Sequence, residues 1–178
     1  MKSINLIECM NFAWKKRNSL SSTEYKRQTF NLITHAFNGV YDAIDEFTGQ
    51  EKFNKLFITF QHVFIYLMKC DDQFLQGEYD VYCDFCKWCK YNSLTVEEVN
   101  NLYKKLDTNI IIEDIRLILN HRNQIGDEKY NLLVLAFCCF SLLGDQSFDE
   151  NEYYIIRCFL YSDIDVFPRD WETFKKEW

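Results

Sequence analysis

The chain has 178 residues, of which 48% are hydrophobic and 26% are charged, a composition typical of a globular domain. Its 27 Asp and Glu residues outnumber its 20 Lys and Arg residues, and the net charge of −7 argues against a general nucleic-acid-binding protein. The 5 Gly and single Pro are too few for a turn-rich all-β fold, and the 17% aromatic content argues against intrinsic disorder. The length fits one domain, residues 1–178.

Apolar residues recur at steps of three and four along the chain, which is typical of amphipathic helices. The first long stripe runs from Phe30 to Phe47, and residues 21–24 before it have the spacing of a capping box. Gly49 is expected to cap the C-terminus of this helix. Gly39 inside the stripe could mark a bend, which leaves two helices as an alternative.

Further stripes predict the remaining helices, and they lie in residues 53–68, 79–89, 99–106, 111–119, 132–143, 153–160 and 168–178. Residues 132–143 are apolar almost all round, which predicts the most buried helix. Only residues 110–112 could be read as a strand. We therefore expect an all-α helical bundle of about eight or nine helices.

Two sequence features predict a cytoplasmic location. The longest apolar run, residues 132–143, is well short of the roughly 20 residues that span a bilayer. Residues 1–20 lack the continuous apolar segment and cleavage site of a signal peptide. The eight cysteines are accordingly expected to be reduced thiols.

An internal repeat appears when the chain is shifted by 74 residues. Each copy reads as an apolar helix, an Asp, two residues, a Phe, three residues, Glu-Tyr and a second apolar helix. The aligned pairs include Asp71 with Asp145, Phe74 with Phe148, Glu78 with Glu152, Tyr79 with Tyr153 and Phe85 with Phe159. This pattern predicts two helix–loop–helix units, residues 56–106 and, with a linking helix, residues 107–178. Residues 1–55 form an N-terminal helical extension.

The repeated loops resemble the helix–loop–helix signature of TerB-like domains, the tellurite-resistance TerB family. In that signature Asp-Gly begins a short loop, and an apolar residue, a capping residue and a Glu of the next helix follow. The resemblance extends from Leu56 to the C-terminus. This chain departs from the signature at Asp72 and Gln146, which replace the glycine, and at Leu75, which replaces the capping residue. The resemblance implies a role in a stress response and an acidic surface associated with divalent metal ions.

Two interpretations of the repeated acids remain open. Asp149 as N-cap and Glu152 three residues later fit a capping box, with Phe74 and Phe148 as hydrophobic plugs. Alternatively, four carboxylates could meet across a pseudo-twofold axis and bind a Ca²⁺- or Mg²⁺-type cation through oxygen. The candidate metal ligands are Asp71, Glu78, Asp145 and Glu152.

Cys83, Cys86 and Cys89 share one helix face, and with His62 or Cys70 they could form a zinc site. Their interleaving with Phe85 and Trp88 favours core packing instead, because a free Cys behaves as a small apolar side chain. Cys138, Cys139 and Cys158 also fall on apolar stripes. Redox sensing is the remaining alternative.

No known catalytic motif is present, and His35, His62 and His121 do not group in the sequence. We therefore expect no enzyme, although a site of scattered catalytic groups stays open. Residues 163–178 are acidic and aromatic, and they fit a last helix that closes the core or an exposed anchor for a partner.

The expected function is a non-enzymatic TerB-like interaction or scaffold module in a stress or defence response, with a protein partner or a second copy of the chain. The alternative is an acidic inhibitor or immunity protein that neutralises its partner.

Overall fold

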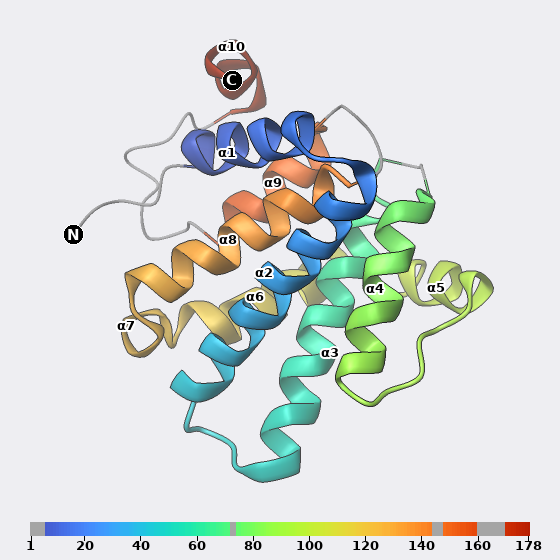
Figure 1. The fold of residues 1–178 in the computed structure, drawn as a ribbon. Coiled ribbons are helices and arrows are strands. Elements are labelled where there is room, and N and C mark those ends of the chain that lie inside the picture. The colour runs from blue at the N-terminus through green and yellow to red at the C-terminus, as the bar shows by residue number, and fades with distance from the viewer. Residues whose placement is uncertain (1–5, 72–73, 144–147, 160–169) are drawn as a thin grey trace.

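The computed structural model describes residues 6–71, 74–143, 148–159 and 170–178. Within these ranges the chain is helical and has no strand (Figure 1). The all-α expectation is confirmed, and Ile110 to Ile112 lie inside a helix. The helices are α1 (Leu6–Ser19), α2 (Ser22–Ala43), α3 (Gly49–Leu67), α4 (Gln76–Trp88), α5 (Val96–Tyr103), α6 (Thr108–Leu119), α7 (Arg122–Ile125), α8 (Asp127–Ser141), α9 (Glu150–Cys158) and α10 (Trp171–Glu177).

The described residues therefore form ten helices, where the sequence predicts eight or nine. The predicted stripes include neither α1 nor α7, and α7 has four residues, which is too short to produce a repeating apolar stripe. No helix in the described ranges is long and apolar enough to cross a bilayer.

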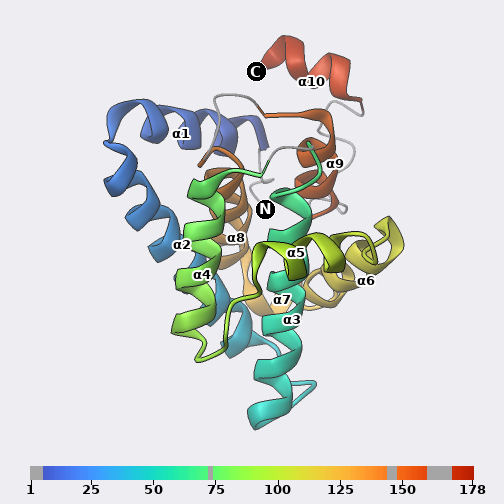
Figure 2. The ribbon, with the colours of Figure 1, turned by 90° about the vertical axis from the view of Figure 1, so that its right-hand side faces the viewer.

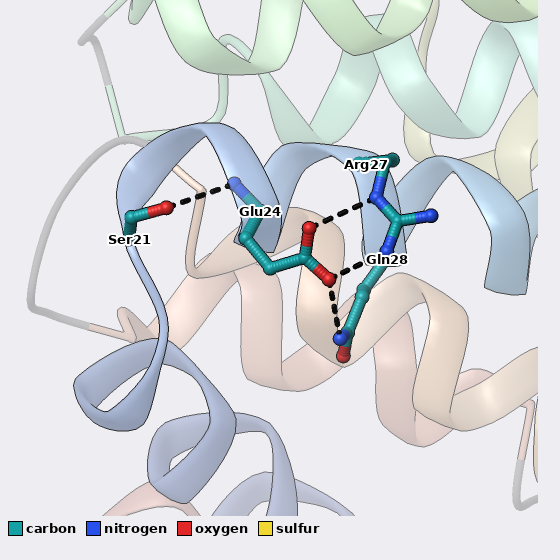
Figure 3. Close-up of polar contacts among 4 residues, drawn as sticks. All are labelled: Ser21, Glu24, Arg27 and Gln28. Atoms are coloured by element: carbon teal, nitrogen blue, oxygen red, sulfur yellow. Dashed lines mark hydrogen bonds and ion pairs between the residues drawn. The ribbon is translucent and has the colours of Figure 1, made fainter.

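α2 begins where the capping residues predict it. The side chain of Ser21 accepts a hydrogen bond from the Glu24 amide, which satisfies one of the free amides of the first turn (Figure 3). The helix runs through Gly39 as one element, so the two-helix alternative is wrong. A Cβ at Gly39 would lie 3.3 Å from Lys129 Cδ, so the glycine permits close packing of α2 on α8.

The predicted role of Gly49 is wrong. α2 ends at Ala43, and Ile44 is its C-terminal cap. Gly49 is instead the first residue of α3, with a φ of +57°, a value that glycine adopts without steric cost. The glycine therefore shapes the turn into the next helix.

α8 is the central helix, as its all-round apolar sequence predicts. It contacts α1, α2, α7 and α9, and Figure 1 shows α1 and α2 lying across it. Nine of its residues are buried: Tyr130, Leu133, Val134, Ala136, Phe137, Cys138, Cys139, Phe140 and Ser141. A helix covered on several sides needs apolar residues on every side.

Aromatic rings from four helices form the middle of the core. The Phe64 ring of α3 lies with its centroid 5.2 Å from that of Phe85 in α4 and 4.7 Å from that of Phe140 in α8. The ring of Phe37 in α2 lies 5.1 Å from that of Phe60 in α3. Such ring pairs add stability beyond the burial of their area.

The helix pairs α3–α4 and α8–α9 have matching boundaries. α3 ends at Leu67 and α8 at Ser141, while α4 begins at Gln76 and α9 at Glu150, so each pair of positions is 74 residues apart. The spacing between equivalent helix ends thus equals the 74-residue offset of the repeat found in the sequence.

Two contacts cross between these pairs at equivalent positions. A Cβ at Gly77, the second residue of α4, would lie 3.2 Å from the carbonyl oxygen of Leu143, just after α8. Asn151, the second residue of α9, donates from Nδ2 to the carbonyl oxygen of Cys70, just after α3, at 2.8 Å. The second helix of each pair therefore begins against the end of the other pair's first helix.

The peripheral helices cover the ends and sides of this core. α5 begins with a capping box of Thr95 and Glu98 and, like α6, packs on α3 (Figure 2). Phe174 of α10 is buried, with its ring centroid 4.6 Å from that of Tyr153. This packing agrees with a last helix that closes the core. Phe167 and Pro168 lie outside the described residues.

Candidate functional site

The predicted acidic residues lie at the two helix turns. Glu78 and Glu152 are each the third residue of a helix, α4 and α9, and their exposed fractions are only 3% and 4%. Asp71 lies in the turn after α3 and is half-buried. Asp145 lies outside the described residues.

At the second turn the acids cap a helix. Asp149 Oδ1 accepts from the Glu152 amide at 2.8 Å, and Glu152 Oε2 accepts from the Asp149 amide at 2.9 Å. This reciprocal pair is the capping box predicted from the sequence, and it satisfies two amides at the start of α9. At the first turn the N-cap is Leu75, which supplies no side-chain bond.

The Cys70 thiol lies between the two turns. Burial is the main cause that raises its pKa, and the charges of Glu152, Asp149, Asp71 and Glu78 raise it further. These acids come from both turns, so three of the four predicted ligands do converge on one region. The thiol is held in its neutral form because a thiolate there would be buried among carboxylates.

Convergence alone does not make a metal centre. Among the residues that the structure describes, no three or more His, Cys, Asp or Glu side chains are grouped so that they could hold a metal ion. The capping bonds also account for oxygens of Asp149 and Glu152. Cation binding by Asp71, Glu78, Asp145 and Glu152 therefore stays a prediction.

Cys86 of α4 and Cys89, the C-cap of that helix, are part of the core, and Cys83 of α4 packs against it half-buried. Cys86 and Cys89 are buried, and their burial raises the pKa of Cys86 to about 11 and that of Cys89 to about 12. Cys138 and Cys139 of α8 are buried as well, and all eight cysteines, each in the described part of the chain, are free thiols. Core packing therefore accounts for them better than a zinc site.

Sequence reasoning missed a histidine–carboxylate pair. His62 Nδ1 of α3 lies 2.6 Å from Asp114 Oδ2 of α6, and both side chains are partly buried. The two residues are 52 positions apart, so only the packing of α6 on α3 brings them together. His121 Nδ1 lies 3.0 Å from the carbonyl oxygen of Leu117 in the preceding turn, and His121 Nε2 lies 3.8 Å from Glu46 Oε2.

An open groove of about 510 Å³ lies where α2, α3 and the C-terminal end of α4 meet. The residues that line it include Asn38, Gln50, Phe53, Trp88, Lys90 and Tyr91. Trp88 keeps 38% of its surface exposed, while its ring packs 5.6 Å from that of Phe37. Below, this feature is called the Trp88 groove. The helical stripes gave no signal for it, because they mark buried positions.

Comparison of the chain with protein-family models, with curated proteins and with solved structures finds no match. The resemblance to TerB-like domains therefore depends on the repeated loop residues alone.

Proposed function

We propose that the chain is a non-enzymatic, TerB-like protein-binding module, and that its partner binds in the Trp88 groove. The observation that carries this proposal is the half-exposed Trp88, whose indole ring packs against Phe37 and Phe85. Tryptophan and tyrosine dominate the energetics of many protein interfaces. A ring already fixed by the core loses little conformational entropy when a partner covers it.

The groove also indicates what the partner presents. Lys90 is the charged residue among those that line it, and Phe53, Trp88 and Tyr91 supply apolar surface. The partner segment therefore carries an apolar anchor residue next to a carboxylate. A role in stress or defence follows from the TerB resemblance.

The test compares matched surface variants in quantitative affinity capture from the source cells. Trp88→Ala removes the anchor ring, and Lys90→Glu reverses the groove charge at an exposed position. Tyr154→Ala and Lys87→Glu are controls at exposed positions that do not line the groove. We expect the same partner to be lost with both groove variants and kept with both controls. Equal recovery with all four proteins would contradict the proposal.

A second candidate is an acidic inhibitor that neutralises a basic partner, and the net charge of −7 favours it. Salt separates the two candidates. Binding through complementary surface charge loses association rate steeply as ionic strength rises, whereas an apolar anchor in the Trp88 groove depends on salt only weakly. Light scattering of the purified chain would also detect a second copy as the partner.

The cation prediction needs its own test, which is thermal unfolding in EDTA and in 10 mM Mg²⁺ or Ca²⁺. A cation that binds only the native state with a Kd of ~1 mM would stabilise it by about 1.4 kcal/mol at that concentration. Glu78→Gln combined with Glu152→Gln would remove this gain. If the double variant is equally destabilised with and without cation, the acids act as caps and not as ligands.

A further inference from the structure

α10 lies at the edge of the molecule, beyond α1 and α9, and aromatic rings hold it there (Figure 1 and Figure 2). The ring centroid of Phe174, which is fully buried, lies 4.6 Å from that of Tyr153 in α9 and 6.2 Å from that of Phe148. The Trp178 ring lies 5.9 Å from that of Phe148 and 6.3 Å from that of Trp14 in α1. Below, the surface formed by Trp14, Phe148 and Tyr153 is called the α10 docking site.

The polar contacts of α10 lie within the helix and its own cap. Asp170 Oδ1 accepts from the Thr173 amide at 2.9 Å, and Lys175 Nζ lies 3.6 Å from Glu172 Oε1. Within the described part of the chain, no hydrogen bond or ion pair joins residues 170–178 to the other helices. Lifting α10 off its docking site therefore breaks ring contacts among the described residues, and docking it again restores them.

Neither α10 nor its docking site is stable when exposed alone. α10 has 7 residues, and isolated helices shorter than about 12–15 residues are marginal in water. With α10 docked, Phe148 and Tyr153 are 4% and 1% exposed. Removing Phe174 would uncover ring surface beside Tyr154, which is already 41% exposed. An undocked α10 and an empty docking site therefore both gain stability by pairing.

We infer that the α10 docking site also takes α10 of a second copy, so that two chains pair by exchanging these helices. A second copy is the occupant that the contacts favour, because its Trp171, Phe174 and Trp178 make the ring contacts already present within one chain. A reciprocal exchange fills both docking sites and closes the dimer.

The exchange depends on chain concentration. Docking within one chain acts at an effective concentration on the order of millimolar, so the closed monomer prevails in dilute solution. The inference is independent of the protein-binding proposal, because the α10 docking site and the Trp88 groove share no residue.

The experiment mixes two variants of the full chain that are defective on opposite sides of the contact. Phe174→Ala removes the buried ring of α10 and leaves the docking site intact, whereas Phe148→Ala damages the site and leaves α10 intact. At roughly 1 mM of each chain, we expect a mixed dimer in which α10 of the Phe148→Ala chain occupies the site of the Phe174→Ala chain. Each variant alone should stay monomeric, because it lacks one side of the contact. Light scattering measures the mass.

Two control substitutions separate helix exchange from other association. Glu177→Ala, at an exposed position of α10, is added to the Phe148→Ala chain and should preserve the mixed dimer. Trp88→Ala, added to both chains, removes the anchor of the Trp88 groove and should preserve it as well. A dimer formed through the groove would instead be lost with Trp88→Ala.

A peptide of residues 170–178 provides a second measurement. The Phe174→Ala chain should bind it at least about tenfold more tightly than the wild-type chain, because the wild-type docking site is already filled by its own α10. NMR of the isotope-labelled chain measures both affinities. The same peptide with Phe174→Ala is the control and should bind neither chain.

Four results would overturn the inference. They are no dimer in the mixture, equal dimerisation of either variant alone, equal peptide affinity for the two chains, or peptide binding without pairing of the full chains. The last result would show that the site accepts a helix of another protein and not α10 of a second copy. If Phe148→Ala proves unfolded by circular dichroism, Trp14→Ala replaces it, because Trp14 is only half-buried and also contacts Trp178.

Discussion

The turn between α3 and α4 and the turn between α8 and α9 occupy equivalent places but begin their second helices differently. α9 starts with the reciprocal bonds of Asp149 and Glu152, whereas α4 starts behind Leu75 without a side-chain cap. The third residue of each helix, Glu78 or Glu152, is nonetheless buried. The two turns therefore differ in the side-chain cap of the second helix, but both bury the glutamate at its third position.

The difference indicates which interactions keep the two turns alike. Gly77 and Asn151 hold equivalent positions, and each lies against a backbone carbonyl just after the first helix of the other pair. These crossed contacts are present in both turns, and the N-cap is present in one. The tertiary contact is thus the shared feature, and the cap is an addition to the second turn.

The largest expected difference between the two pairs lies in the core. Phe64 of α3 and Cys138 of α8 occupy equivalent, fully buried positions. Phe64→Ala should lower the free energy of unfolding by about 3–5 kcal/mol, because it removes a ring that contacts Phe85 and Phe140. Cys138→Ala should cost about 1 kcal/mol for one small apolar group. Urea unfolding followed by circular dichroism measures both, and equal losses would contradict the prediction.

The crossed contacts should show the next largest effect. Gly77→Val places side-chain atoms beyond a Cβ that already lies 3.2 Å from the Leu143 carbonyl oxygen, and it should cost about 1–3 kcal/mol. Asn151→Ala removes the bond to the Cys70 carbonyl oxygen and should cost about 1 kcal/mol. The same urea titration applies. Neutral behaviour of both variants would show that the junction does not depend on these contacts.

Exchanging the caps tests the difference between the turns directly. Asp149→Ala removes the N-cap of α9 and should cost about 1 kcal/mol. Leu75→Ser adds the missing acceptor at the start of α4 and should recover up to about 1 kcal/mol, less the loss from the half-buried leucine. Thermal unfolding of the two single variants checks the opposite signs. If both variants lose stability by the same amount, a side-chain cap does not stabilise α4.

The first turn of α2, which lies outside both helix pairs, gives a stability effect that depends on pH (Figure 3). Hydrogen bonds from Arg27 and Gln28 lower the pKa of Glu24 from 4.5 to about 2. A lowered folded-state pKa gives stability that is present above pH ~4.5 and is lost as the pH falls towards 2. Glu24→Gln should reduce the loss of stability in that window by a small amount, because the Glu24 side chain is partly exposed and solvent screens its interactions. Thermal melts across pH measure it, with Glu97→Gln as the control for loss of another exposed carboxyl group.

Much of the helical framework could be read from the sequence, because its signals are local. The stripes predict the described helices except α1 and α7, and the Ser21 and Asp149 caps lie where their spacing places them. The predicted C-terminal cap at Gly49 is wrong, because a lone glycine between two helices fits the end of the first helix as well as the start of the next. For the candidate site, the sequence located the acids but not the Trp88 groove.

The sequence by itself determined the all-α class, the central position of α8 and the capping box of α9. Each follows from residues within a few positions of one another, where helix periodicity and backbone amides act. Only the tertiary structure decided that the Asn151 side chain bonds to the Cys70 carbonyl oxygen and that His62 meets Asp114. These partners come from separate helices, and their distances are set by how whole helices pack.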